Sequence, residues 1–173
     1  MKFHITKSLF SLACGAAVLL GSTAVVAEEA PLLVPIKRMS METALRVAQG
    51  AIKACRKEGV QIAVTVVDRG GHPQVMLRDV LAMDMAQRIS EQKAYAAMSF
   101  NAPTSSLEGR FKTYGSVGKI EGAIFSAGGI PVQAGGQIIG GVGVSGAPSG
   151  KTDESCAQAG IAAVQDDLDM AGD

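Results

Sequence analysis

The chain has 173 residues, of which 47% are hydrophobic and 18% are charged, a composition that suits one globular domain with a sizeable core. Aromatic residues make up 4% of the chain, Trp is absent and the formal net charge is zero. These values argue against a base-stacking platform and against binding to nucleic acid or to an anionic membrane surface.

Residues 1–27 are predicted to be a signal peptide. Lys2 and Lys7 precede an apolar run over residues 9–20, and residues 25–27, Val-Val-Ala, suit a signal peptidase. A membrane anchor is the alternative, but the run is shorter than the roughly 20 apolar residues that a span needs. We therefore expect a mature chain that begins at Glu28, is periplasmic or secreted, and has no membrane contact after signal removal.

Two cysteines, Cys55 and Cys156, remain in the expected mature chain. Because export leads to an oxidising compartment, a disulfide between them is one interpretation. Two separate, small buried side chains are the other. The sequence leaves both open.

The first elements are predicted to be a helix followed by a β-hairpin. After an extended lead-in over residues 28–39, Ser40 caps a helix that ends at Gly59. Residues 60–68 form a strand, and a second short strand follows a turn, over residues 74–78. The expected buried face of the helix comprises Met41, Ala44, Leu45, Ala48, Ile52 and Cys55.

A second helix is predicted from Met83 to about Phe100. Its apolar spacing continues until residues 101–103, Asn-Ala-Pro, stop it. The polar stretch over residues 104–107 is then a short helix or a loop. The residues at helical spacing are Ala86, Ile89, Lys93, Ala96 and Ala97.

Glycine-rich strands and a final helix complete the chain. We expect a strand over residues 122–126 and then a hairpin over residues 128–146, with a turn at Gly135-Gly136 and a return strand over residues 138–144. The last helix covers residues 153–167, behind a cap at Thr152 or Asp153. The order of elements predicts one antiparallel sheet with helices packed on it, in a single domain over residues 40–173.

Two phosphate-binding patterns near this hairpin are rejected. Gly146 is one residue too close to Gly150-Lys151-Thr152 for a phosphate loop, which needs four residues between its glycines. Residues 141–146 match Gly-x-Gly-x-x-Gly but begin inside a hairpin strand, whereas a dinucleotide site needs a strand-to-helix turn. Close packing against helices is the preferred explanation for these glycines.

His72 is the only histidine of the expected mature chain, so one subunit cannot provide a histidine-rich metal site. It is either a solvated turn residue or a ligand of haem iron or another transition metal. Arg69, Arg78 and Lys93 could pair with haem propionates, or could be ordinary surface charges. Covalent haem attachment is excluded because no Cys-x-x-Cys-His motif occurs.

Several segments, in order, resemble the GlcG/HbpS family. Residues 66–72 read Val-Val-Asp-Arg-Gly-Gly-His, and residues 92–97 read Gln-Lys-Ala-Tyr-Ala-Ala. The Pro-Thr at residues 103–104, the hairpin over residues 128–146 and the helix segment over residues 153–160 also fit the family's pattern. The likeness covers about residues 39–168. The chain departs from the pattern after Arg78-Asp79, where Val-Leu-Ala replaces a Gly-Ala pair.

This resemblance implies an α/β (α+β) domain of the profilin-like, three-layer α/β/α type, with a five-stranded antiparallel sheet. It also implies a homo-oligomer, and it implies non-covalent binding of b-type haem, as in some members. Such proteins resemble the C-terminal domain of PduO-type proteins, and some accompany the catabolism of small acids.

The leading hypothesis is therefore a secreted, oligomeric haem-binding protein that stores, scavenges or senses haem and has no catalytic residues. His72 would bind the iron, with Thr104 or Tyr95 as alternative oxygen donors. A second hypothesis is an enzyme for a small hydroxy or carboxylic acid, with Asp68, His72, Arg78 and Lys93 lining its pocket. A third is an accessory protein that docks other subunits or a periplasmic dehydrogenase.

Overall fold

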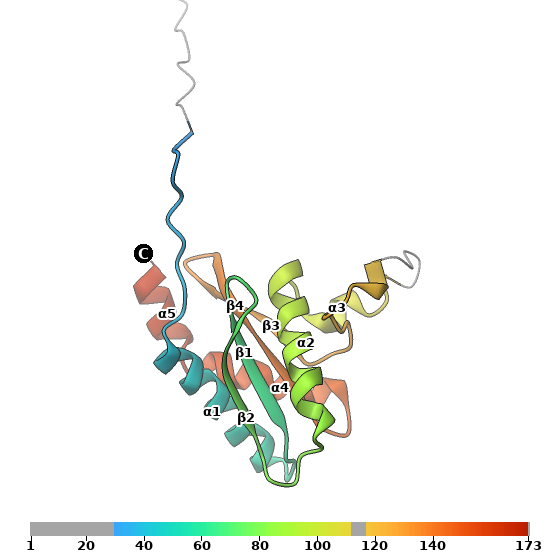
Figure 1. Ribbon diagram of the computed structural model, residues 1–173. Coiled ribbons are helices and arrows are strands. Elements are labelled where there is room, and N and C mark those ends of the chain that lie inside the picture. Colours follow the sequence, from blue (N-terminus) through green and yellow to red (C-terminus); the bar gives the residue numbers. More distant parts are fainter. Residues whose placement is uncertain (1–29, 112–116, 173) are drawn as a thin grey trace, which may run out of the picture. The chain divides into compact units, whose positions relative to one another are not determined.

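The computed structural model describes residues 30–111 and 117–172. Four strands form one antiparallel sheet in the order β2-β1-β4-β3, so that β1 and β4 are central (Figure 1). The sheet consists of two hairpins joined side by side through β1 and β4. The strands are β1 (Ala63–Asp68), β2 (Pro73–Arg78), β3 (Gly129–Ala134) and β4 (Gln137–Ser145).

Helices cover both faces of this sheet, which gives three layers (Figure 1). Helices α1 and α4 pack against each other and against one face, while α2 packs on the other face. The helices are α1 (Met41–Lys57), α2 (Met85–Phe100), α3 (Thr104–Leu107), α4 (Gly150–Ala162) and α5 (Gln165–Gly172), with a short 3-10 helix at Val117–Lys119. Among the described residues, no helix is long and apolar enough to cross a bilayer.

Strand β1 is buried along its whole length because it has helices on both faces. Val64 and Val66 point into the main core with α1 and α4, whereas Val67 packs with Ala94 and Met98 of α2. Successive side chains of a strand point to opposite faces. The apolar run of β1 therefore contributes side chains to a hydrophobic core on each face of the sheet.

Glycines on the α2 side of the sheet allow that helix to approach closely. A Cβ atom on Gly141 would lie 2.6 Å from the carbonyl oxygen of Ala94, and one on Gly143 would lie 2.5 Å from the amide nitrogen of Ala94. Gly143 pairs with Gly129 of β3 and with Thr65 of β1, which makes a row of small residues under α2. The predicted packing role of the hairpin glycines is confirmed.

Several predicted element ends are also confirmed. Ser40 caps α1 by accepting a hydrogen bond from the amide of Thr43, and Gly59 follows the helix with a φ of 72°. Asn101 ends α2 in the left-handed conformation. Gly135 and Gly136 form the β3–β4 turn with φ values of 53° and 73°, a region that glycine adopts without strain.

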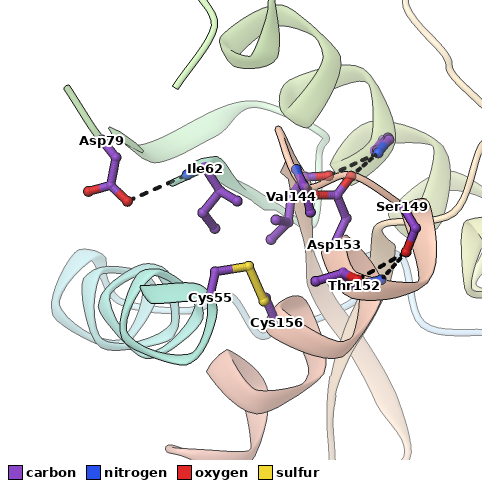
Figure 2. Close-up of a disulfide and its surroundings, with 10 residues drawn as sticks. Cys55, Ile62, Asp79, Val144, Ser149, Thr152, Asp153 and Cys156 are labelled. Carbon is purple, nitrogen blue, oxygen red and sulfur yellow. Dashed lines mark hydrogen bonds and ion pairs between the residues drawn. A yellow bond between two sulfur atoms is a disulfide. The ribbon is translucent and has the colours of Figure 1, made fainter. Parts of the chain in front are cut away.

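Cys55 of α1 and Cys156 of α4 form a disulfide, with 5.5 Å between their Cα atoms. Figure 2 shows this bond bridging the two helices beneath the sheet. Both cysteines are buried within the main core. The sequence left two interpretations of these cysteines open, and the structure shows that they form the disulfide.

The predicted five-stranded sheet is wrong, because the described sheet has four strands. Residues 122–126, the expected extra strand, form turns and coil instead. Gly122 has a φ of 80°, and the amide of Ile124 donates to the carbonyl oxygen of Gln92 on α2 rather than to a strand. This segment therefore belongs to the helical layer.

Other boundaries also differ from the prediction. The final helix is two helices, broken after Ala162, and it begins at Gly150 because Ser149, not Thr152 or Asp153, is the cap. Met41, expected to face inward, is the first residue of α1 and is exposed. Helix α2 begins at Met85 rather than Met83.

The remaining domain predictions concern the ends of the chain. The predicted signal peptide, residues 1–27, lies outside the described residues. Residues 30–39 of the expected lead-in contain no helix or strand. From Pro35 onward the chain is one compact unit.

Candidate functional site

The turn between β1 and β2 is organised around the carboxylate of Asp68. Its Oδ1 atom accepts hydrogen bonds from the amides of Gly70, at 2.8 Å, and His72, at 3.0 Å. A short acidic side chain that binds amides two and four residues further on is typical of such turns. Oδ2 is 3.3 Å from the guanidinium of Arg38, which ties the turn to the segment before α1.

The Asp68 carboxylate is held in its charged form. Its burial, the largest single effect, favours the neutral acid, but the amides of His72 and Gly70 together with the charges of Arg38 and His72 outweigh it. The pKa of Asp68 is therefore lowered from its ordinary value. A fixed negative charge thus lies at the base of the turn.

His72 stands on this turn with its side chain 80% exposed. Its Nδ1 atom lies 3.5 Å from Oδ1 of Asp68. A carboxylate at one ring nitrogen orients an imidazole and leaves the other nitrogen, Nε2, available to a metal. The side chain has both the access and the chemistry of a ligand for haem iron.

The turn packs directly on α2 through Gly71. This residue has a φ of 84°, and a Cβ atom on it would lie 2.7 Å from the ring of Tyr95 and 3.0 Å from the side chain of Met98. Arg69 reaches the same helix, with 3.8 Å between its guanidinium and the sulfur of Met98. Arg69 and Gly71 of this turn therefore lie against α2.

A cavity of about 260 Å³ lies beside this turn. Sequence analysis missed most of its lining, although Arg88, Gln92 and Tyr95 are spaced by four and three residues and so share one face of α2. Glu121 and Gly122 come from a distant loop that no local pattern could connect with the turn. The lining residues are Gly71, Arg88, Glu91, Gln92, Tyr95, Glu121 and Gly122.

Arg78 lies away from this group of residues. Pro73 and Arg78 are the two ends of β2, and six residues of strand span roughly 17–20 Å. The guanidinium of Arg78 donates to the carbonyl oxygen of Ala82 at 2.6 Å and lies 3.2 Å from the carboxylate of Asp84. It holds the β2–α2 connection at the far end of the hairpin.

Lys93 and Thr104 are both buried on another side of α2. Nζ of Lys93 lies 3.0 Å from both the carbonyl oxygen of Val144 and Oδ2 of Asp153, so its charge is engaged within the protein. Oγ1 of Thr104 accepts a hydrogen bond from the amide of Gly129 at 2.8 Å. The structure therefore does not bring Lys93, Arg78 and His72 into one pocket.

The residues at the turn fit a haem group by their chemistry. They provide an imidazole beside a carboxylate, a cation at Arg69 and an aromatic residue, Tyr95, that is 36% exposed. Within the described residues, no three or more His, Cys, Asp or Glu side chains cluster in a way that could hold a bare metal ion. A single imidazole suits an iron that a porphyrin already holds.

A family model described as "Haem degrading protein HbpS-like" matches residues 39–162. The chain belongs to the HbpS-like family. The match contains the Asp68–His72 turn, helix α2 and the glycine-rich hairpin. The family resemblance inferred from those same motifs is thereby confirmed. No curated protein sequence is significantly similar to the chain.

Solved structures agree with this assignment. A double mutant of Streptomyces reticuli HbpS is 40% identical, with a TM-score of 0.74 over 82% of this chain and 97% of that one. Klebsiella pneumoniae protein ORFY is 26% identical, with a TM-score of 0.74 over 79% and 97% of the two chains. A PduOC:heme complex is also 26% identical, with a TM-score of 0.68 over 73% and 95%.

Proposed function

We propose that this chain binds haem without a covalent bond, at the β1–β2 turn, with His72 as the iron ligand. The observation that carries the proposal is the exposed imidazole with its Nδ1 atom 3.5 Å from the Asp68 carboxylate. The family, described as haem-degrading and HbpS-like, and the PduOC:heme complex connect relatives with haem. Arg69 would pair with a propionate, and the Tyr95 ring would lie against the porphyrin.

One subunit offers only part of such a site. The cavity beside the turn, at about 260 Å³, is smaller than the roughly 300–1,000 Å³ of most ligand pockets. A haem bound at the exposed His72 would therefore keep one face open. We propose that a second subunit covers that face, so that the protein acts as a homo-oligomer.

The proposed role is haem storage, scavenging or sensing in the periplasm or outside the cell. The Cys55–Cys156 disulfide supports an oxidising compartment. The predicted signal peptide supports the same location. Mass spectrometry of the protein from the cell envelope should give a chain that begins at Glu28; a chain that keeps residues 1–27 would contradict export.

Haem binding can be tested on protein produced in haem-replete cells. The purified protein should carry a Soret band that elutes with it in gel filtration, and light scattering should give a mass of more than one chain. A colourless protein that also fails to shift the Soret band of added haem would overturn the proposal.

The size of the cavity favours a second candidate, a small hydroxy or carboxylic acid. Arg88 and Gln92 line the cavity and could bind a carboxylate, although Glu91 and Glu121 line it as well. Asp68, His72, Arg78 and Lys93 do not form the pocket that the sequence suggested for such an acid. Calorimetry with a panel of small hydroxy acids tests this candidate, and silence across the panel would exclude it.

A further inference from the structure

Several large apolar side chains are exposed where β2 runs into α2. Single exposed apolar residues are ordinary on a protein surface, but a group of neighbouring ones marks a site of interaction. This group lies at the opposite end of β2 from the turn that carries His72. We call it the apolar corner; its members are Val80, 83% exposed, Leu81, 77%, Met83, 58%, and Met85, 61%.

Hydrogen bonds hold the apolar corner in place. The amide of Ala82 donates to the carbonyl oxygen of Asp79 at 3.0 Å, which makes a β-turn with Val80 and Leu81 at its centre. The amide of Leu81 also donates to Oε1 of Gln61 at 2.9 Å. Small and polar residues usually occupy the centre of such turns. Here two large apolar side chains are held out in solvent by a fixed backbone.

Cations lie beside the apolar corner, at the end of α1. Arg56 pairs with Asp79, the residue directly before Val80, and so joins α1 to the corner. Figure 1 shows the end of α1 beside the β2–α2 connection, at one end of the domain. A groove of about 600 Å³ between α1 and β2 begins there, and its lining contains three cations and no carboxylate. The lining residues are Gln49, Ile52, Lys53, Arg56, Lys57 and Leu77.

Two lysines of this groove are available to an anionic ligand. Lys53 and Lys57 lie four residues apart on one face of α1 and form no ion pair within residues 30–111 and 117–172. Glu58, which follows Lys57, offsets one of these two charges. Asp84, which lies within the corner, is paired with Arg78 at 3.2 Å. The end of α1 therefore carries a local excess of positive charge in a chain whose net charge is zero.

The form of the apolar corner fits a bilayer better than a protein surface. A stable protein interface takes about 20–30 residues from each partner, many more than one turn presents. A bilayer accepts single apolar side chains at the boundary of its acyl chains, and its anionic head groups attract lysines beside them. An apolar point with cations next to it has both properties.

We infer that the apolar corner docks on the surface of a membrane that contains anionic phospholipid. Val80 and Leu81 enter the boundary of the acyl chains, and Lys53 and Lys57 lie against lipid phosphates. The zero net charge predicted no such contact, because it averages over the whole chain. The candidate haem site, at the other end of β2, stays outside the bilayer, so that docking does not depend on haem.

A single tryptophan tests the insertion directly, because the chain has no Trp of its own. In Leu81→Trp, vesicles of phosphatidylcholine and phosphatidylglycerol should shift the emission to shorter wavelength, and brominated acyl chains should quench it. Met170→Trp is the matched control, whose emission should not change. Met170 is 74% exposed on α5, which packs against β3 at the opposite edge of the sheet.

Each tryptophan reports on its own surroundings, so the full-length chain can be used whether or not residues 1–27 bind vesicles. Emission of Leu81→Trp that the vesicles leave unchanged would overturn the inference. Equal quenching in Leu81→Trp and Met170→Trp would overturn it as well, because the contact would then not be specific to the corner.

Vesicle flotation of protein from the cell envelope separates the two contributions to binding. Val80→Ser/Leu81→Ser should weaken binding about tenfold. Lys53→Gln/Lys57→Gln should weaken it about tenfold on vesicles with phosphatidylglycerol and leave it unchanged on phosphatidylcholine alone. Lys151→Gln, an exposed lysine on α4 outside the groove, is the matched control and should change nothing. Equal binding by all these proteins would contradict the inference.

Light scattering without vesicles distinguishes a protein partner from a membrane. Val80→Ser/Leu81→Ser should have the same mass in solution as the wild type, because both side chains are exposed and the lipid is absent. A smaller mass would show that the apolar corner joins copies of this chain, and docking on a membrane would be rejected.

Discussion

Lys93 and Asp153 form an ion pair inside the protein, with 3.0 Å between Nζ and Oδ2 and only 5% of either side chain exposed. The pair joins α2 to α4 across the end of β4, where Lys93 also donates to the carbonyl oxygen of Val144. Asp153 in turn accepts from the amide of Ala147 at 2.9 Å, and Figure 2 shows its carboxylate close to β4. Burial is the largest effect on this carboxyl and raises the pKa of Asp153 although Lys93 opposes it.

Breaking this pair should be costly. Lys93→Met leaves a buried carboxylate without its cation, and we expect the free energy of unfolding to fall by about 3–5 kcal/mol. Urea unfolding measures the change. Arg46→Met is the matched control, because Arg46 pairs with Asp167 at the surface and its loss should cost about 0–1 kcal/mol. Equal losses in the two variants would contradict a structural role for the buried pair.

The hairpin glycines make a second prediction. In Gly143→Ala the new Cβ would collide with the carbonyl oxygen of Ser90 and lie 2.5 Å from the amide nitrogen of Ala94, so α2 must shift away from the sheet. We expect a loss of about 1–3 kcal/mol. Gly109→Ala, where nothing lies within 4 Å of the new Cβ, should stay within about 0.5 kcal/mol of the wild type. Thermal unfolding of both variants checks this difference.

The disulfide should contribute strongly to stability because it closes a long loop. Cys55 and Cys156 are 101 residues apart, and loops of about that length give up to roughly 4.7 kcal/mol. The Cys55→Ala/Cys156→Ala variant should lose about 2–5 kcal/mol in urea unfolding. A reductant should lower the stability of the wild type alone. If thiol titration of the unfolded wild type found both thiols free, the bond would be disproved.

The Asp68 turn predicts a specific dependence of stability on pH. Because the folded pKa of Asp68 is lowered, its ionised form stabilises the fold above the unfolded pKa of about 3.9, and this contribution is lost as pH falls through the folded value. Asp68→Asn should therefore be less stable than the wild type at pH 7. The difference should shrink toward pH 3. If urea unfolding gives the same difference in unfolding free energy between the two proteins at pH 7 and pH 3, the assigned charge of Asp68 is contradicted.

Local signals in the sequence predicted much of the fold correctly. Ser40, Asn101 and the Gly135-Gly136 turn act through neighbouring backbone atoms, so that the sequence alone locates the ends of α1, α2 and β3. The expected strand over residues 122–126 failed because the amide of Ile124 donates to the distant Gln92 of α2. Long-range contacts of this kind leave no local pattern.

Prediction of the candidate functional site from the sequence meets the same limit. The motif over residues 66–72 identified the turn, and its Arg69 and Gly71 do lie against Met98 and Tyr95 of α2. Lys93 resembled a surface cation in the sequence, yet its partner Asp153 is 60 residues away. Only the folded structure, in which Lys93 of α2 reaches Asp153 of α4 across the end of β4, shows that its charge is already paired.

The most direct test of the account is a haem titration, followed at the Soret band, of the wild type and of His72→Ala. We predict saturable binding by the wild type and a Kd raised at least tenfold in His72→Ala, with loss of the spectrum of an imidazole-bound iron. Arg46→Ala, an exposed change on α1, should bind as the wild type does. A wild type that binds no haem would contradict the assignment of the β1–β2 turn as a haem site. A His72→Ala variant with unchanged affinity and spectrum would contradict the assignment of His72 as the iron ligand.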